Sequence, residues 1–136
     1  MSWRKDARGV VRRYPQHKAD LEALRSSAVT PNYNGTQVSH EASRTTEDVA
    51  MRTLPRDAQM EYDAVDFAIR TTRAQHPRDW QDRVKAIGLM YWSQHRRLYA
   101  EGVALEIPCS VDLVKRWNGE FLSLVDAYAM IMAARF

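Results

Sequence analysis

Residues 98–117 read LYAEGVALEIPCSVDLVKRW, and this stretch decides the interpretation of the chain. Its apolar residues recur at helical spacing on both sides of a Pro-Cys-Ser segment at 108–110, which predicts helices over 98–107 and 111–134. Two helices that cross steeply through a three-residue turn are typical of a helix-turn-helix. The sequence therefore predicts an all-α protein whose C-terminal part holds a helix-turn-helix at about 98–119.

The residue types inside this helix pair fit the predicted geometry. Val103 and Ile107 of the first helix should face the same core as Val114 and Trp117 of the second. Ala104 is small at the point where the second helix is expected to approach closely.

The second helix of the pair carries the residues expected to face a DNA groove. Ser110 is a natural N-cap for it. Arg116 can bind the O6 and N7 atoms of a guanine, whereas Lys115 suits a phosphate or a single acceptor. The predicted DNA contacts, including two arginines before the pair that can clamp phosphates, are Ser110, Val111, Asp112, Lys115, Arg116, Arg96 and Arg97. The alternative is an ordinary helical hairpin with a charged outer face.

The N-terminal part of the chain is predicted to be helical and basic. Residues 3–26 favour helix, with a joint at Tyr14-Pro15 where the proline would start a second segment, giving a hairpin or a kinked helix. Residues 29–44 are dense in residues that break helices and start turns, so they are the expected linker. The predicted organisation is a helical segment at 1–28, the linker at 29–44 and a DNA-binding domain at 45–136.

Two more helices are expected between the linker and the helix pair. Helix resumes after Thr45, Pro55 should break or kink it, and the amphipathic pattern continues to near His76. Pro77 stands in the favoured first position of the next helix. The apolar stripe expected to enter the core from that helix is Trp80, Val84, Ile87 and Tyr91.

Charge is distributed unevenly along the chain. The 136 residues carry 20 Lys and Arg against 17 Asp and Glu, a net charge of +3. The surplus lies in residues 1–25 and 71–136, while residues 26–70 are acidic. Two basic regions can both face phosphate. In the first of them, Arg12 and Arg13 are the expected phosphate contacts, made without regard to base sequence.

Composition argues against several functional classes. The longest apolar stretch, 121–134, contains Asp126 and falls short of the roughly 20 residues that a bilayer span needs. No secretory signal is readable, so a cytoplasmic protein is expected. The single cysteine, Cys109, cannot form an intramolecular disulfide or a cysteine-rich zinc site. We expect no cofactor, no metal and no catalysis, because the glycines form no phosphate loop and the histidines lack a metal-ligand spacing. These histidines are His17, His40, His76 and His95.

The helix pair resembles the C-terminal region of phage-encoded transcriptional regulators of the RinA and ArpU type, whose reading head is similar to sigma factor region 4. The resemblance covers most of the chain, in the expected order. The motifs that carry it outside the helix pair are Tyr14-Pro15 followed by Lys18, Leu21, Glu22, Leu24 and Arg25, then Thr30-Pro31 and Gly35, then Ser43, Thr46, Glu47 and Ala50, and finally Tyr91-Trp92. Pro108 stands where such proteins usually have glycine.

This resemblance implies a DNA-binding activator of phage late genes, such as packaging and structural operons, in the cytoplasm of a bacterial host. It implies double-stranded promoter DNA as the ligand and contact with host RNA polymerase. A symmetric homodimer is expected in addition, because one short recognition helix reads too few bases for an operator.

Two other functions remain open from the sequence. A phage terminase small subunit is also a small helical protein that binds DNA through a helix-turn-helix, but it assembles into a ring. A helical protein-interaction module would instead dock a partner on the apolar C-terminal helix, whose stripe is Phe121, Leu122, Leu124, Val125, Tyr128, Met130 and Ile131. Burial of this stripe against the rest of the domain, or in a homodimer seam, would account for it equally.

Overall fold

The computed structural model describes residues 6–27, 52–93 and 96–135. Within these ranges the chain forms five α-helices and one π-helical turn, and no strand, so the predicted all-α class is confirmed. The linker expected at 29–44 and the helix expected to start after Thr45 lie outside the described residues. None of the helices in the described ranges is long and apolar enough to cross a membrane.

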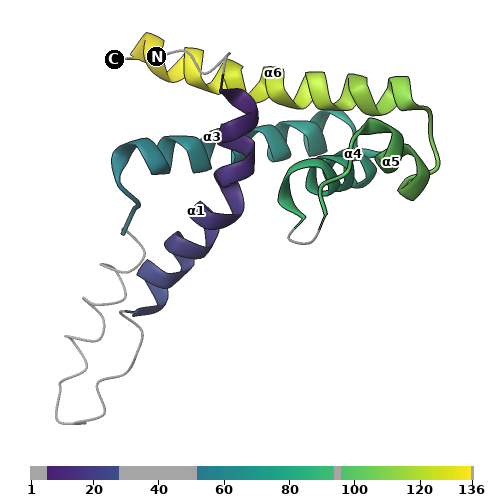
Figure 1. Ribbon diagram of the computed structural model, residues 1–136. Coiled ribbons are helices and arrows are strands. Elements are labelled where there is room, and N and C mark those ends of the chain that lie inside the picture. Colours follow the sequence, from purple (N-terminus) through teal and green to yellow (C-terminus); the bar gives the residue numbers. More distant parts are fainter. Residues whose placement is uncertain (1–5, 28–51, 94–95, 136) are drawn as a thin grey trace, which may run out of the picture.

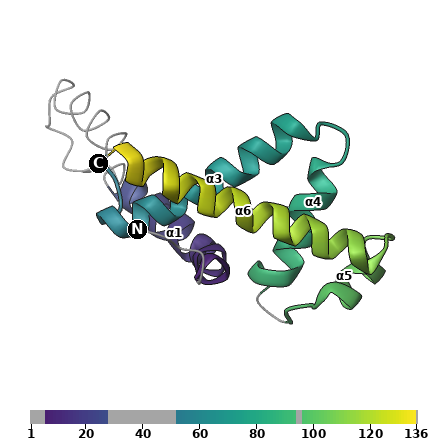
Figure 2. The same ribbon diagram turned by 90° about the horizontal axis from the view of Figure 1, so that it is seen from above.

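The longest helix, α6 (Val111–Arg135), runs along one side of the molecule and contacts most of the other helices (Figure 1). Its most extensive contacts are with α3 (Arg56–Gln75), and α1 (Ala7–Ser27) packs against both of them. Figure 2 shows α6 lying over these helices, with none of the described elements above it. The predicted C-terminal helix at 111–134 is thus correct to within one residue.

Three short elements lie against the N-terminal half of α6. They are α4 (Trp80–Ile87), the π-helical turn η1 (Gly88–Trp92) that continues it directly, and α5 (Ala100–Glu106). The prediction that Pro77 begins a helix is wrong. Residues 77–79 form a turn and α4 begins at Trp80, since the residue before it has a φ of −125° that does not belong to a helix.

The buried side chains form two clusters that α6 connects. The larger cluster joins α1, α3, the α4–η1 segment and the C-terminal half of α6 through Val10, Val11, Tyr14, Ala64, Val65, Ala68, Ile87, Tyr91, Phe121, Val125 and Ala129. The smaller cluster joins α4, α5 and the N-terminal half of α6. Of the stripe predicted for the helix after Pro77, Ile87 and Tyr91 are fully buried, whereas Trp80 and Val84 are only half-buried.

The N-terminal segment is a single helix, although its sequence contains a proline. Pro15 lies inside α1 and cannot donate the hydrogen bond that the main-chain oxygen of Val11 would otherwise accept. The indole Nε1 of Trp92 donates to that oxygen instead, at 2.7 Å. The rings of Tyr14 and Trp92 also pack together, with centroids 5.4 Å apart. The joint predicted at Tyr14-Pro15 therefore does not form a hairpin, because a distant side chain replaces the missing donor.

Candidate nucleic-acid interface

The segment with the predicted DNA contacts is a helix pair formed by α5, a turn at 107–110 and the first three turns of α6. Both helices stand close to their predicted positions, although α5 begins two residues later than expected. At the end of α5, the amide of Ile107 still donates to the oxygen of Val103, at 2.8 Å. The backbone then leaves the helical conformation, since Ile107 has φ −111° and ψ 103°.

Ser110 caps the second helix of the pair, as predicted. Its Oγ accepts a hydrogen bond of 3.1 Å from the amide of Leu113, and its main-chain oxygen accepts one of 3.2 Å from the amide of Val114. The side-chain bond satisfies an amide of the first turn that has no partner within the helix. The start of α6 is thereby defined by the local sequence.

The helix pair is held together by the smaller core cluster. Val103 and Val114 are completely buried, and the full buried set is Ala86, Ala100, Val103, Ile107, Val114 and Trp117. The four core residues predicted for the pair are therefore confirmed. Ala104 lies at the edge of the cluster and is half-buried. A close approach is found at Gly102, where an added Cβ would lie 3.3 Å from the side chain of Leu98.

The cations of α6 point away from this core. Lys115 and Arg116 are exposed, and neither forms an ion pair with any residue that the structure describes. Of the other predicted contacts on this helix, Ser110 and Asp112 are exposed and Val111 is half-buried. The exposed side of the pair is not uniformly basic, because Glu101, Glu106 and Asp112 also lie on it.

Two more exposed arginines, Arg96 and Arg97, lead into the helix pair. The backbone next to them is anchored, since the amide of Leu98 donates to the oxygen of Leu89 at 3.0 Å. The amide of Arg96 lies 3.4 Å from the Oγ of Ser93. The two side chains therefore extend from a segment that the fold holds in place.

The arginines predicted to bind phosphate from α1 have partners inside the protein. Arg13 donates to Asp6 and, through two of its nitrogens, to both carboxylate oxygens of Glu61 on α3, at 2.8–3.0 Å. Arg12 lies over the ring of Tyr91, with its guanidinium carbon 5.8 Å from the ring centroid. A phosphate at Arg13 would compete with two carboxylates, so the geometry gives this residue an internal role.

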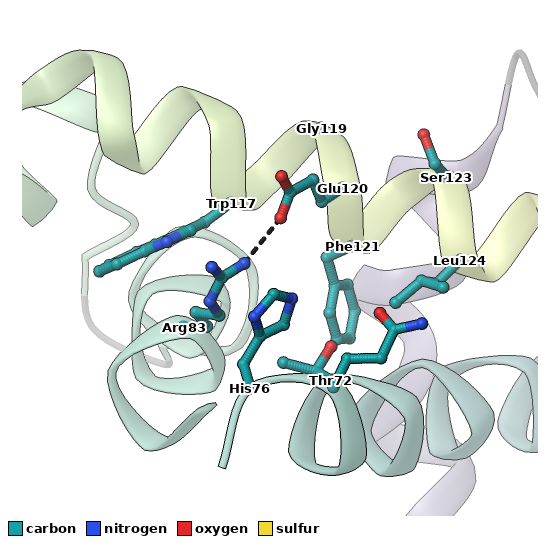
Figure 3. Close-up of a pocket in the computed structure, with 10 residues that line it drawn as sticks. Thr72, His76, Arg83, Trp117, Gly119, Glu120, Phe121, Ser123 and Leu124 are labelled. Carbon is teal, nitrogen blue, oxygen red and sulfur yellow. Dashed lines mark hydrogen bonds and ion pairs between the residues drawn. The ribbon is translucent and has the colours of Figure 1, made fainter. Parts of the chain in front are cut away.

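Sequence reasoning missed Arg83, which fixes α4 to the helix pair. It lies in a groove of about 530 Å³ between α3, α4 and α6, and its side chain reaches Glu120 at 2.6 Å (Figure 3). It also pairs with Asp79 at 3.2 Å and covers the ring of Trp117 at 5.7 Å. The spacing of Asp79 and Arg83 was a readable signal for a helical ion pair. The contact with Glu120 was not, because it joins residues 37 positions apart.

The histidines in the described ranges form no metal site. His17 Nε2 lies 2.9 Å from Glu61, and His76 lines the groove shown in Figure 3. Within the parts of the chain that the structure describes, no group of histidine, cysteine and carboxylate side chains is arranged to hold a metal ion.

Comparisons of the chain with protein-family models, with curated proteins and with solved structures find no match. The resemblance to phage regulators therefore rests on the sequence motifs alone. The arguments that follow use the geometry of the helix pair and the state of its cations.

Proposed function

We propose that the chain is a sequence-specific DNA-binding protein in which the α5–α6 pair is a helix-turn-helix and the start of α6 enters the major groove. The observation that carries this proposal is the contrast between two kinds of arginine. Arg13 and Arg83 are held by carboxylates, whereas Arg116 and its neighbour Lys115 are exposed without an ion pair in the described residues. Exposed cations on a firmly packed helix suit a partner that carries negative charge.

The rigidity of the pair supports base reading as well as phosphate binding. A recognition helix must present its side chains in one fixed register, because discrimination between bases depends on hydrogen-bond geometry. The cap at Ser110 and the buried residues Val114 and Trp117 hold α6 in such a register. Arg116 can then fork onto a guanine, while Lys115, Arg96 and Arg97 contact the backbone phosphates.

The cellular role that we propose is regulation of phage genes, with activation of late genes as the specific form. This part of the proposal comes from the motif order that resembles phage regulators. Promoter DNA is the proposed ligand, and host RNA polymerase is the proposed protein partner.

Selection of duplexes from a randomised DNA pool by the full chain tests the proposal, because no operator is needed in advance. We expect a defined sequence to be enriched and then bound in a fluorescence anisotropy titration. The double variant Lys115→Ala with Arg116→Ala should lose this binding. A site worth about 1–3 kcal/mol for the arginine alone corresponds to roughly 5-fold to 150-fold weaker binding.

The matched control for this experiment is Arg70→Ala. Arg70 is also a highly exposed helical arginine, with 80% of its side chain accessible, but it lies on α3 and pairs with Asp66. Its loss should leave DNA affinity unchanged. The proposal fails if no sequence is enriched, or if the double variant binds the enriched duplex as tightly as the unmodified chain.

A further inference from the structure

The outward side of α6 changes character along its length. Its first half exposes charged side chains, among them Asp112, Lys115, Arg116 and Glu120. Between 121 and 134 the only charged residue is Asp126, which is half-buried. The exposed residues of this second half are Ser123, Met130, Ile131, Ala133 and Ala134. A helix face open to water normally carries charge, so an exposed face without it indicates a partner.

The exposed apolar residues are not surplus members of the core. Phe121, Val125 and Ala129 already supply the inward face of this half of α6 and are at most 3% accessible. Met130 and Ile131 lie beyond that face, with 53% and 44% of their surface accessible. The apolar stripe of the C-terminal helix thus divides into an inner row that the domain buries and an outer row that it leaves open.

Beside the outer row lies a hollow that complements it. A groove of about 670 Å³ runs between the start of α1 and α6, and its floor on α6 includes the small residues Ser123 and Ala127. Met130 stands at one end of this groove. Because a helix rises 1.5 Å per residue, the large side chains follow the small ones by roughly 10 Å along the same face.

Small and large residues in this order make the surface complementary to itself. If two copies pair with their α6 helices antiparallel, Met130 of each copy lies over Ser123 and Ala127 of the other, and large side chains fill hollows. A parallel pair would instead set Met130 against Met130 and leave the hollows empty. The absence of exposed charge removes the electrostatic cost of bringing two identical faces together.

We propose that the C-terminal half of α6 is the seam of a symmetric, antiparallel homodimer, with the outer row of one copy seated in the groove of the other. The contact is isologous, so it closes after two copies. The proposal deepens the proposed function, and it rests on that function only for its purpose. Each copy carries its recognition end at the start of α6, so that the dimer presents two identical ends to two half-sites.

Sedimentation equilibrium of the full chain without DNA tests the seam directly. We expect a concentration-dependent mass that rises from 15.7 kDa to twice that value. Met130→Glu places a charge in the seam and should weaken dimerisation at least tenfold. Leu105→Glu is the matched control, since Leu105 is 84% exposed but lies on α5, away from the seam. Circular dichroism should show that both variants keep their helices, because both positions are exposed.

Cysteine crosslinking determines the direction of the helices. In a Cys109→Ser background, a mixture of Ser123→Cys and Met130→Cys chains should form the mixed disulfide in preference to either symmetric one. Preferential linkage of Met130→Cys to itself would show a parallel pair and overturn the antiparallel seam.

Three other outcomes also overturn the proposal. They are a single-chain mass at all concentrations, a dimer that Met130→Glu leaves intact, and a ring of many copies, which would favour the terminase alternative. Because these measurements contain no DNA, their failure is distinct from failure of the proposed function. A chain that dimerises but selects no DNA sequence would retain the seam and lose the recognition helix.

Discussion

The indole Nε1 of Trp92 donates a 2.7 Å hydrogen bond to the main-chain oxygen of Val11, the oxygen that Pro15 leaves without its helical donor. This contact ties the end of η1 to the middle of α1. A buried carbonyl without a donor is costly, so the tryptophan allows the proline to remain inside the helix.

Trp92→Phe should lower the free energy of unfolding by about 1–3 kcal/mol, because the Val11 oxygen loses its donor. Chemical denaturation measures this change. In a Pro15→Ala background the alanine amide can bond to the same oxygen, so Trp92→Phe should cost less there. Equal costs in the two backgrounds would show that the proline and the tryptophan are not coupled.

Stability should depend on the ionisation of Glu61 in acid. Burial raises the pKa of Glu61, but hydrogen bonds from Arg13 and His17 outweigh it, so that the pKa lies below the ordinary value of 4.5. A lowered pKa stabilises the folded state above the unfolded value, and this contribution is lost as the pH falls through the folded value. Thermal unfolding should therefore show a stability loss below about pH 4.5 that Glu61→Gln reduces. Glu22→Gln, at an exposed position on α1, should leave the acid profile unchanged.

Arg83 should contribute more to stability than its ion pair with Glu120 alone. Only 15% of the Arg83 side chain is accessible, whereas Glu120 is 48% accessible. Glu120→Gln should cost at most about 1 kcal/mol, since solvent screens a half-exposed pair. Arg83→Ala should cost more, about 1–3 kcal/mol, because it also uncovers Trp117 and frees Asp79. Denaturant titration of the two variants distinguishes these effects, and equal losses would reduce Arg83 to a simple charge partner.

The basic residues near the helix pair should separate into base-reading and phosphate-binding groups. Arg116→Ala should cost about 1–3 kcal/mol on the selected DNA site and relax the preference at one base pair. Loss of Arg96 and Arg97 should flatten the plot of log affinity against log salt by roughly 0.9 per contact, on specific and nonspecific DNA alike. Arg13→Ala should reduce stability and leave the salt dependence unchanged. A purely electrostatic effect of Arg116→Ala would exclude its role in reading bases.

The packing of the helix pair can be tested at two adjacent positions. Val103→Lys places a charge in a site with no accessible surface and should unfold the pair, at a cost of at least about 3 kcal/mol. Ala104→Lys, at a half-buried site, should cost less, about 1–3 kcal/mol. Thermal unfolding and DNA binding should be lost together in both variants. Unchanged stability of Val103→Lys would contradict the observed core.

Much of the helix pair was predictable because its signals are local. The cap at Ser110, the break around Pro108 and the inward set of Val103, Val114 and Trp117 follow from residue types and helical spacing. The same reasoning failed at Pro77, where the turn before α4 takes three residues that the proline rule assigned to the helix. It also made Ala104 the point of close approach, whereas Gly102 against Leu98 supplies a tight contact at 3.3 Å.

By itself, the sequence determined the all-helical class, the bounds of α6 and which side of the helix pair faces the core, since these depend on contacts within a few residues. Only the tertiary structure decided which cations are already used and whether Pro15 interrupts α1. Those outcomes depend on partners 37, 48 and 81 positions away along the chain, at Arg83, Arg13 and Trp92. It also decided that α6 buries Phe121 and leaves Met130 open. Helical spacing shows that a residue is apolar and on which side it lies, but the area that neighbouring helices cover depends on how they pack.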